Sequence, residues 1–237
     1  MMTPFKAEAE FEQDLTNFAK IHKTVIAEHS KHISDYHEMS CYCMIIRYYE
    51  MQGFSSEIAN LSPGGFKFKC SPKGLLKNFS YFKVKKDNQT YRIYHNASVQ
   101  SRYGKHIFTT PDIVVANDIE PTIINDYYIT KYGFSFIPNK QLVTFCEAKN
   151  FNPYPELMFN FVGIVHELLP SCMRNKRNNR NLHIAPSLMM SGSFSKQAKE
   201  IKESLEKRYN INILGDLFVD PYHLVFSYTG LPYIKKL

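Results

Sequence analysis

The chain has no tryptophan and only five cysteines in 237 residues. The cysteines are odd in number, irregularly spaced and never arranged as C-x-x-C, which disfavours a disulfide framework, a zinc knuckle and a thioredoxin-type redox site. Reduced thiols in an intracellular protein are the simplest interpretation of this pattern. The five positions are Cys41, Cys43, Cys70, Cys146 and Cys172.

Three common signatures of chemical sites are incomplete in this chain, and each incomplete match argues against a class of function. Gly64-Gly65-Phe66-Lys67 lacks the G-x4-G-K-[ST] pattern of a nucleotide-binding P-loop. His166-Glu167 lacks the second histidine of the H-E-x-x-H metalloprotease motif. Ser193 and Lys196 match S-x-x-K, but the other motifs of a β-lactamase are absent, so Ser195 is predicted to cap a helix.

No apolar run is long enough to cross a bilayer. The longest, from Leu157 to Leu169, is shorter than the roughly 20 residues that a transmembrane helix needs. The residues from Met1 to Glu8 are polar and acidic, whereas a signal peptide is basic and then apolar. We therefore expect a cytoplasmic protein with no membrane partner.

The residues that are present indicate a globular protein. Hydrophobic residues make up 44% of the chain and aromatic residues 14%, which is enough for a substantial core. The length favours one domain, expected as a helical N-terminal extension at residues 1–37 and a core at residues 38–237. The net charge of +7 favours a polyanionic partner, although an ordinary soluble surface explains that charge about as well.

Apolar spacing and helix-capping residues predict four helices, from Thr3 to Val25, Glu38 to Met51, Pro155 to Leu169 and Lys196 to Tyr209. Short apolar or alternating segments between them predict strands. These segments are residues 55–61, 66–70, a hairpin at 79–99, and residues 111–115, 142–149, 183–190, 211–219 and 223–228. The interleaved order predicts an α/β fold.

The segment from Pro111 to Asn150 contains the residues best suited to catalysis. Asp112 opens one predicted strand, and Glu147 and Lys149 end another. Because side chains alternate along a strand, Glu147 and Lys149 share a face and Ala148 points to the other. If the two strands are neighbours, two carboxylates and an ammonium meet at one end of a sheet. Carboxylates are the oxygen ligands that Mg²⁺ takes, together with water and substrate phosphate.

Pro111-Asp112 and Glu147-Ala148-Lys149 resemble the two halves of the PD-(D/E)xK nuclease motif. The resemblance implies a restriction-endonuclease-like mixed β-sheet flanked by helices. It further implies Mg²⁺ or Mn²⁺ held by Asp112, Glu147 and the carbonyl of Ala148. Lys149 then orients the attacking water and stabilises developing charge. The implied function is endonucleolytic hydrolysis of phosphodiester bonds in DNA. A restriction-type or phage-defence role is consistent with this function, although nothing in the sequence selects it, and a homodimer is left open.

The carboxylate set keeps two alternatives open at this point. The segment between Asp112 and Glu147 is long and holds Asp118, Glu120 and Asp126, any of which can replace Asp112 as the partner of Glu147. The resemblance also implies a glutamate from the preceding helix as a further metal ligand. Glu38 matches this position best and Glu50 lies at the far end of the helix, but a plain exposed carboxylate explains either residue.

Three histidines precede that helix, at His29, His32 and His37, beside Asp35 and Glu38. Their spacing matches no known zinc motif. We interpret them as solvated residues at helix ends rather than as a metal site.

Two basic groups are candidates for nucleic-acid binding. Lys83, Lys85 and Arg92 lie on the predicted hairpin among tyrosines, and a second group follows Cys172. A solvated hairpin face and a solvated loop explain these groups as readily as phosphate contacts do. The second group consists of Arg174, Lys176, Arg177 and Arg180.

A second hypothesis is a non-catalytic nucleic-acid-binding or scaffold protein with a nuclease-like fold. A third is that Glu147 and Lys149 form only a structural ion pair at a strand end. The presence of Asp112, Glu147 and Lys149 together favours the enzyme, and only the enzyme should depend on a divalent metal. If Glu147 and Lys149 are a structural pair, their mutation should alter stability more than activity.

Overall fold

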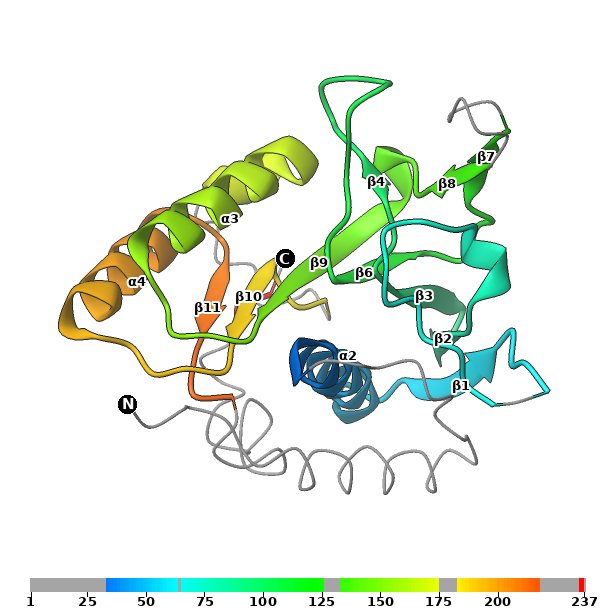
Figure 1. Cartoon of the computed structure of the whole chain (residues 1–237), viewed down its shortest axis with the longest axis horizontal. Coiled ribbons are helices and arrows are strands. Elements are labelled where there is room, and N and C mark those ends of the chain that lie inside the picture. Colours follow the sequence, from blue (N-terminus) through cyan, green and yellow to red (C-terminus); the bar gives the residue numbers. More distant parts are fainter. Residues whose placement is uncertain (1–32, 64, 126–132, 175–182, 218–234, 237) are drawn as a thin grey trace.

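Seven strands form one mixed sheet at the centre of the computed structural model, which describes residues 33–63, 65–125, 133–174, 183–217 and 235–236. The strand order is β1-β2-β3-β6-β9-β10-β11 (Figure 1). Neighbours from β1 to β9 pair antiparallel, whereas β10 is parallel to both β9 and β11. The strands are β1 (Ser55–Ala59), β2 (Tyr81–Lys86), β3 (Gln89–His95), β6 (Ile113–Asn117), β9 (Leu142–Lys149), β10 (Ser187–Met190) and β11 (Asn212–Leu214).

Helices cover both faces of this sheet. Helix α2 (Ile33–Met51) packs on one face, against side chains such as Ile113 and Cys146. Helices α3 (Pro155–Leu168) and α4 (Lys196–Arg208) cover the other face, against side chains such as Val114 and Phe145 (Figure 1). The alternation of Ile113, Val114, Cys146 and Phe145 between two hydrophobic cores follows from the period of two in a strand. The described chain is therefore a three-layer α/β structure.

Small elements border the main sheet. Two short antiparallel pairs are β4 (Val99–Gln100) with β5 (Phe108–Thr109), and β7 (Thr122–Ile124) with β8 (Phe134–Phe136). Three short 3₁₀ helices are η1 (Leu76–Asn78), η2 (Asn139–Gln141) and η3 (Pro170–Met173). Within the residues described, the structure has no helix with the length and apolar character needed to traverse a membrane.

Several elements confirm the sequence predictions. Strand β9 begins and ends at the predicted residues, and α3 and α4 each end one residue before the predicted end. Ser195 caps α4, since its hydroxyl accepts the backbone N–H of Ala198 at 3.2 Å. Gly53 follows α2 with a φ of +85°, a conformation that glycine adopts without steric strain.

Two predictions about elements are wrong. Residues 66–70 form no strand; Phe66 and Phe68 are buried, and their rings pack against each other and against Tyr42 of α2. Helix α2 starts at Ile33, five residues before its predicted start at Glu38. The predicted helix from Thr3 to Val25 and the predicted strand at 223–228 lie outside the described residues.

Candidate active site

The antiparallel pairing of β6 with β9 brings the motif residues together. Ile113 faces Cys146 in the register, so the preceding Asp112 lies opposite the following Glu147. Lys149 is two residues further along β9 and shares the face of Glu147. β9 is also the strand at which pairing changes from antiparallel, with β6, to parallel, with β10. The expectation that the two strands are neighbours is confirmed.

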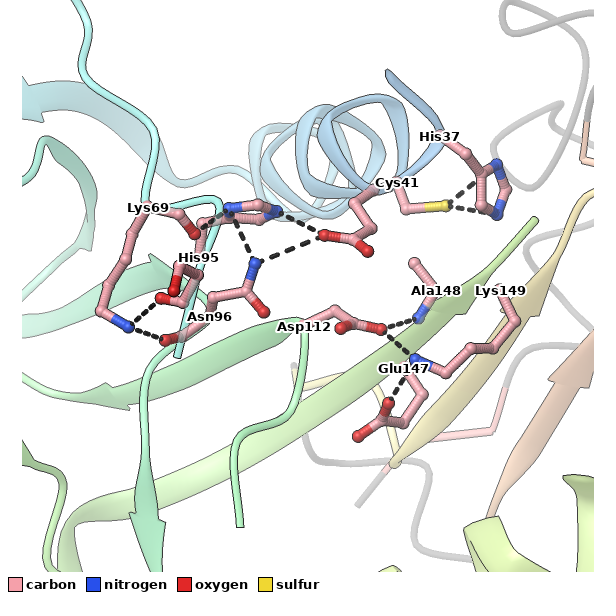
Figure 2. A network of polar contacts seen from close by, with 11 residues as sticks. His37, Cys41, Lys69, His95, Asn96, Asp112, Glu147, Ala148 and Lys149 are labelled. Atoms are coloured by element: carbon pink, nitrogen blue, oxygen red, sulfur yellow. Dashed lines mark hydrogen bonds and ion pairs between the residues drawn. The ribbon is translucent and has the colours of Figure 1, made fainter. Parts of the chain in front are cut away.

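Lys149 joins the two carboxylates directly. Its Nζ lies 2.7 Å from Oδ2 of Asp112 and 2.9 Å from Oε2 of Glu147 (Figure 2). The backbone N–H of Ala148 donates to the same Oδ2 of Asp112 at 2.7 Å. The Asp112 carboxylate thus accepts the N–H of Ala148 just beyond Ile113 and Cys146, the last paired residues of β6 and β9 at this end. This hydrogen bond fixes the carboxylate relative to β9.

Burial controls the charges at this site. Glu147 is 6% exposed and Asp112 is 7% exposed. Burial raises the pKa of Glu147 well above its ordinary value, the negative charge of Asp112 raises it further, and Lys149 opposes both. Burial lowers the pKa of Lys149, but the two carboxylates outweigh this effect and raise it above its ordinary value. In this arrangement Lys149 is therefore positively charged at neutral pH.

Removing the charge of Glu147 is expected to stabilise the metal-free protein at alkaline pH. The folded-state pKa of Glu147 lies above its ordinary value of 4.5, so stability falls as the pH rises from that value through the raised pKa. In EDTA at about pH 9, we expect Glu147→Gln to unfold at a higher temperature than the native protein. The gain should be about 2–4 °C for each kcal/mol relieved.

The matched control for this measurement is Glu57→Gln. The Glu57 side chain is 53% exposed and bridges Lys85 on the surface, so its replacement should leave the melting temperature nearly unchanged. The difference between native protein and Glu147→Gln should shrink as the pH falls toward about 4.5, the ordinary value. An unchanged melting temperature of Glu147→Gln at alkaline pH would contradict a strained buried charge at this position.

Glu38, the helix carboxylate predicted as a further ligand, is connected to Asp112 through one residue. Its Oε2 lies 3.3 Å from Nδ2 of Asn96 and 3.6 Å from Nε2 of His95. The backbone N–H of Asn96 in turn donates to the carbonyl of Asp112 at 2.8 Å. Glu50 instead contacts Arg47 and Ser56. Glu50 lies 12 residues after Glu38 on α2, which corresponds to roughly 18 Å along the helix at 1.5 Å per residue.

A buried polar network that the sequence did not reveal supports this side of the site. Nζ of Lys69 donates to the carbonyl of Asn96 at 2.7 Å, and the carbonyl of Lys69 lies 2.9 Å from Nδ1 of His95 (Figure 2). Burial lowers the pKa of Lys69 to about 8. Asn96 has a φ of 49°, and asparagine tolerates this left-handed conformation better than most residues. An asparagine directly after a predicted strand is the only local feature of the sequence that points to this network.

His37 is packed inside the protein, so its prediction as a solvated helix end is wrong. It is 1% exposed on α2, and its Nε2 lies 3.3 Å from the carbonyl of Met189 on β10. Burial lowers the pKa of His37 to about 4, so the ring is neutral at pH 7. Cys41, one helical turn later, contacts the same ring and is fully buried. His29 and His32 lie outside the described residues.

The alternative carboxylates on the β6–β9 connection lie elsewhere. Asp118 and Glu120 follow the far end of β6, and both form ion pairs with Arg92. Asp112 is therefore the carboxylate next to Glu147 in the described structure, and Asp126 lies outside it. Arg92 is only 6% exposed and is occupied by acidic partners, which corrects its prediction as a phosphate contact.

The other predicted binding residues are distributed over the surface. Lys83 lies 3.5 Å from Asp118, and Lys85 lies 2.7 Å from Glu57 with 46% of its side chain exposed. Arg174 is exposed after η3. Lys176, Arg177 and Arg180 lie outside the described residues. The structure does not bring Lys83, Lys85 and Arg174 into contact with the Asp112 site.

The donor set at this site fits a hard divalent cation that is completed by substrate and water. Within the described ranges, no cluster of three or more His, Cys, Asp and Glu side chains is arranged to hold a metal ion. Mg²⁺, however, typically uses one or two carboxylates plus waters and phosphate oxygens. Two buried carboxylates supply that number here, and the carbonyl of Ala148 lies beyond the last β6–β9 pair.

Comparisons with protein families, curated proteins and solved structures find no match for this chain.

Proposed function

We propose that this chain is a metal-dependent nuclease that hydrolyses phosphodiester bonds in DNA. The observation that carries the proposal is one ammonium, Lys149, held between two buried carboxylates, Asp112 and Glu147, at the end of two adjacent strands. The order α2, β1–β3, β6, β9, α3, β10 also agrees with the helix–strands–ExK strand–helix–strand order of PD-(D/E)xK nucleases. A restriction-endonuclease-like core is part of the same proposal.

Each residue of the site has a separate role in this mechanism. Asp112, Glu147 and the carbonyl of Ala148 would hold Mg²⁺ or Mn²⁺, and the ion would supply a Lewis acid that polarises the phosphate and lowers the pKa of water. Lys149 keeps its positive charge and places it where negative charge develops on the phosphoryl oxygens. Its Nζ also donates a hydrogen bond that orients the attacking water. Glu38 is the further carboxylate on the α2 side of the site.

A structural ion pair is the competing interpretation, and one observation favours it. Nζ of Lys149 contacts both carboxylates directly, as it would in a purely structural network. A structural network predicts that replacing Lys149 changes stability and leaves any activity unaffected. The proposed enzyme predicts a loss of activity with a folded protein, so melting temperature and cleavage must be measured on the same sample.

The proposal is tested by cleavage of supercoiled plasmid DNA with Mg²⁺ or Mn²⁺. We expect nicking by the native protein, none in EDTA, and a loss of about a hundredfold or more in Lys149→Ala because a charge-stabilising group is removed. Lys140→Ala is the matched control, since Lys140 is exposed in η2 before the opposite end of β9. Equal cleavage by native protein and Lys149→Ala would contradict the assigned site.

A further inference from the structure

Two exposed aromatic rings lie directly beyond the motif lysine. Phe151 is 41% exposed and Tyr154 is 44% exposed, and their ring centroids are 5.9 Å apart at an angle of 36°. Two extended residues span at most about 7 Å, so Phe151 lies within that distance of Lys149 along the chain. Large exposed rings in mutual contact next to a catalytic strand are candidates for ligand binding, because they leave apolar surface in water.

The backbone holds this aromatic pair in place from both sides. The N–H of Ser191 donates to the carbonyl of Lys149 at 3.2 Å, and the N–H of Gly192 donates to the carbonyl of Phe151 at 3.3 Å. A Cβ atom at Gly192 would meet the Cα of Asn152 at 2.6 Å, so only glycine permits this close approach. Tyr154 is the N-cap residue of α3. The backbone that carries the two rings is therefore tied to the segment after β10 and to the start of α3.

The position of the rings selects the ligand. A phosphodiester held at Asp112, Glu147 and Lys149 carries a nucleotide on each side. Phe151 follows Lys149 by two residues, at most about 7 Å along the chain, and its ring contacts that of Tyr154, so the aromatic pair is near enough to meet one of these nucleotides. In a perfect duplex both faces of each base are covered by neighbouring bases, whereas an unpaired base offers a free face. Aromatic side chains bind such a face by stacking, with little dependence on sequence.

We propose that Phe151 and Tyr154 form a stacking surface for an unpaired nucleobase next to the scissile phosphate. The preferred substrate is then nucleic acid with a single-stranded segment, not uninterrupted duplex. This inference rests on the proposed nuclease function, because the phosphate site places the base against the rings. The inference predicts that the affinity of the protein for single strands depends on Phe151 and Tyr154. Its affinity for duplex should not depend on these two residues.

The absence of tryptophan from the chain allows a direct optical test. Phe151→Trp keeps an aromatic face and introduces the only tryptophan of the chain, whose emission can be excited selectively over that of the tyrosines. Tyr103→Trp is the matched control, since Tyr103 is 57% exposed and stacks on His166 near the far end of α3. Both are made in an Asp112→Asn background, which slows turnover by about 10²–10³-fold and removes a negative charge facing the phosphate. A labelled single-stranded oligonucleotide and its duplex are then titrated, with anisotropy reporting binding and emission reporting stacking.

We expect the single strand to bind and to quench Phe151→Trp but not Tyr103→Trp, and the duplex to leave both emissions unchanged. In the same background, the double change Phe151→Ala with Tyr154→Ala should weaken single-strand binding about tenfold or more. Binding without quenching of Phe151→Trp overturns the stacking surface alone, and equal quenching by duplex overturns the preference for unpaired nucleotides. If the native protein neither binds nor cleaves any nucleic acid, the proposed function fails, and the inference fails with it.

Discussion

Replacing Asp112 by asparagine is expected to lower the rate of metal-dependent DNA cleavage by about 10²–10³-fold. In the proposed mechanism this carboxylate supplies negative charge to the metal ion, and its Oδ2 accepts hydrogen bonds from both Ala148 N–H and Lys149 Nζ. An amide oxygen can keep one of these hydrogen bonds but not the charge. The single-turnover rate at saturating Mg²⁺ measures the effect on chemistry, and a far-UV spectrum and melting temperature verify the fold.

The matched control for this variant is Asp118→Asn. Asp118 follows the other end of β6, where it pairs with Arg92 and Lys83, away from Glu147. We expect its cleavage rate to stay within a few-fold of the native rate. A native rate in Asp112→Asn, or an equally large loss in Asp118→Asn, would mean that the assigned carboxylate is not the catalytic one.

Replacing Tyr42 by alanine is expected to reduce the free energy of unfolding by about 3–5 kcal/mol, the range for large aromatic-to-alanine changes in cores. Tyr42 is fully buried on α2, and its ring packs against Phe66, Phe68, Phe82 and His95. Its hydroxyl donates to the carbonyl of Ile93 on β3 at 2.7 Å. One side chain therefore attaches α2 to the sheet, and urea denaturation measures its contribution.

Tyr42→Phe separates packing from hydrogen bonding in this experiment. It keeps the ring and removes the hydroxyl, so we expect a smaller loss of about 1 kcal/mol. Because His95 contacts both Tyr42 and Glu38, Tyr42→Ala should also lower the affinity for metal, whereas Tyr42→Phe should preserve it. A loss below about 1 kcal/mol for Tyr42→Ala would contradict the packing seen around this ring.

The parts of the fold that the sequence predicts are those with local signals. Pro155 starts α3 and Ser195 caps α4, so a few adjacent residues determine where each helix begins. Strand β9 is an apolar run that turns polar at its end, and its boundaries are correct. The proximity of Asp112 and Glu147 follows once the strands bearing them are neighbours.

The parts that the sequence did not predict depend on distant contacts. Arg92 has the pattern of an exposed hairpin cation, yet it is buried and forms ion pairs with Asp118 and Glu120 from beyond β6. His37 contacts Met189, 152 positions away, so no local pattern predicts its burial. The alternation at residues 66–70 resembles a strand, but its two phenylalanines pack around Tyr42 instead. In each case tertiary packing outweighs local preference.

Direct binding of a divalent cation tests the central claim that Asp112 and Glu147 form a metal site. Titration calorimetry with Mn²⁺ should be carried out on native protein, Asp112→Asn, Glu147→Gln and the surface control Glu57→Gln. We expect saturable Mn²⁺ binding by the native protein and by Glu57→Gln, with a rise in melting temperature, and a loss of both effects in the two site variants. Equal Mn²⁺ binding by all four proteins, or by none of them, would contradict the proposed metal site.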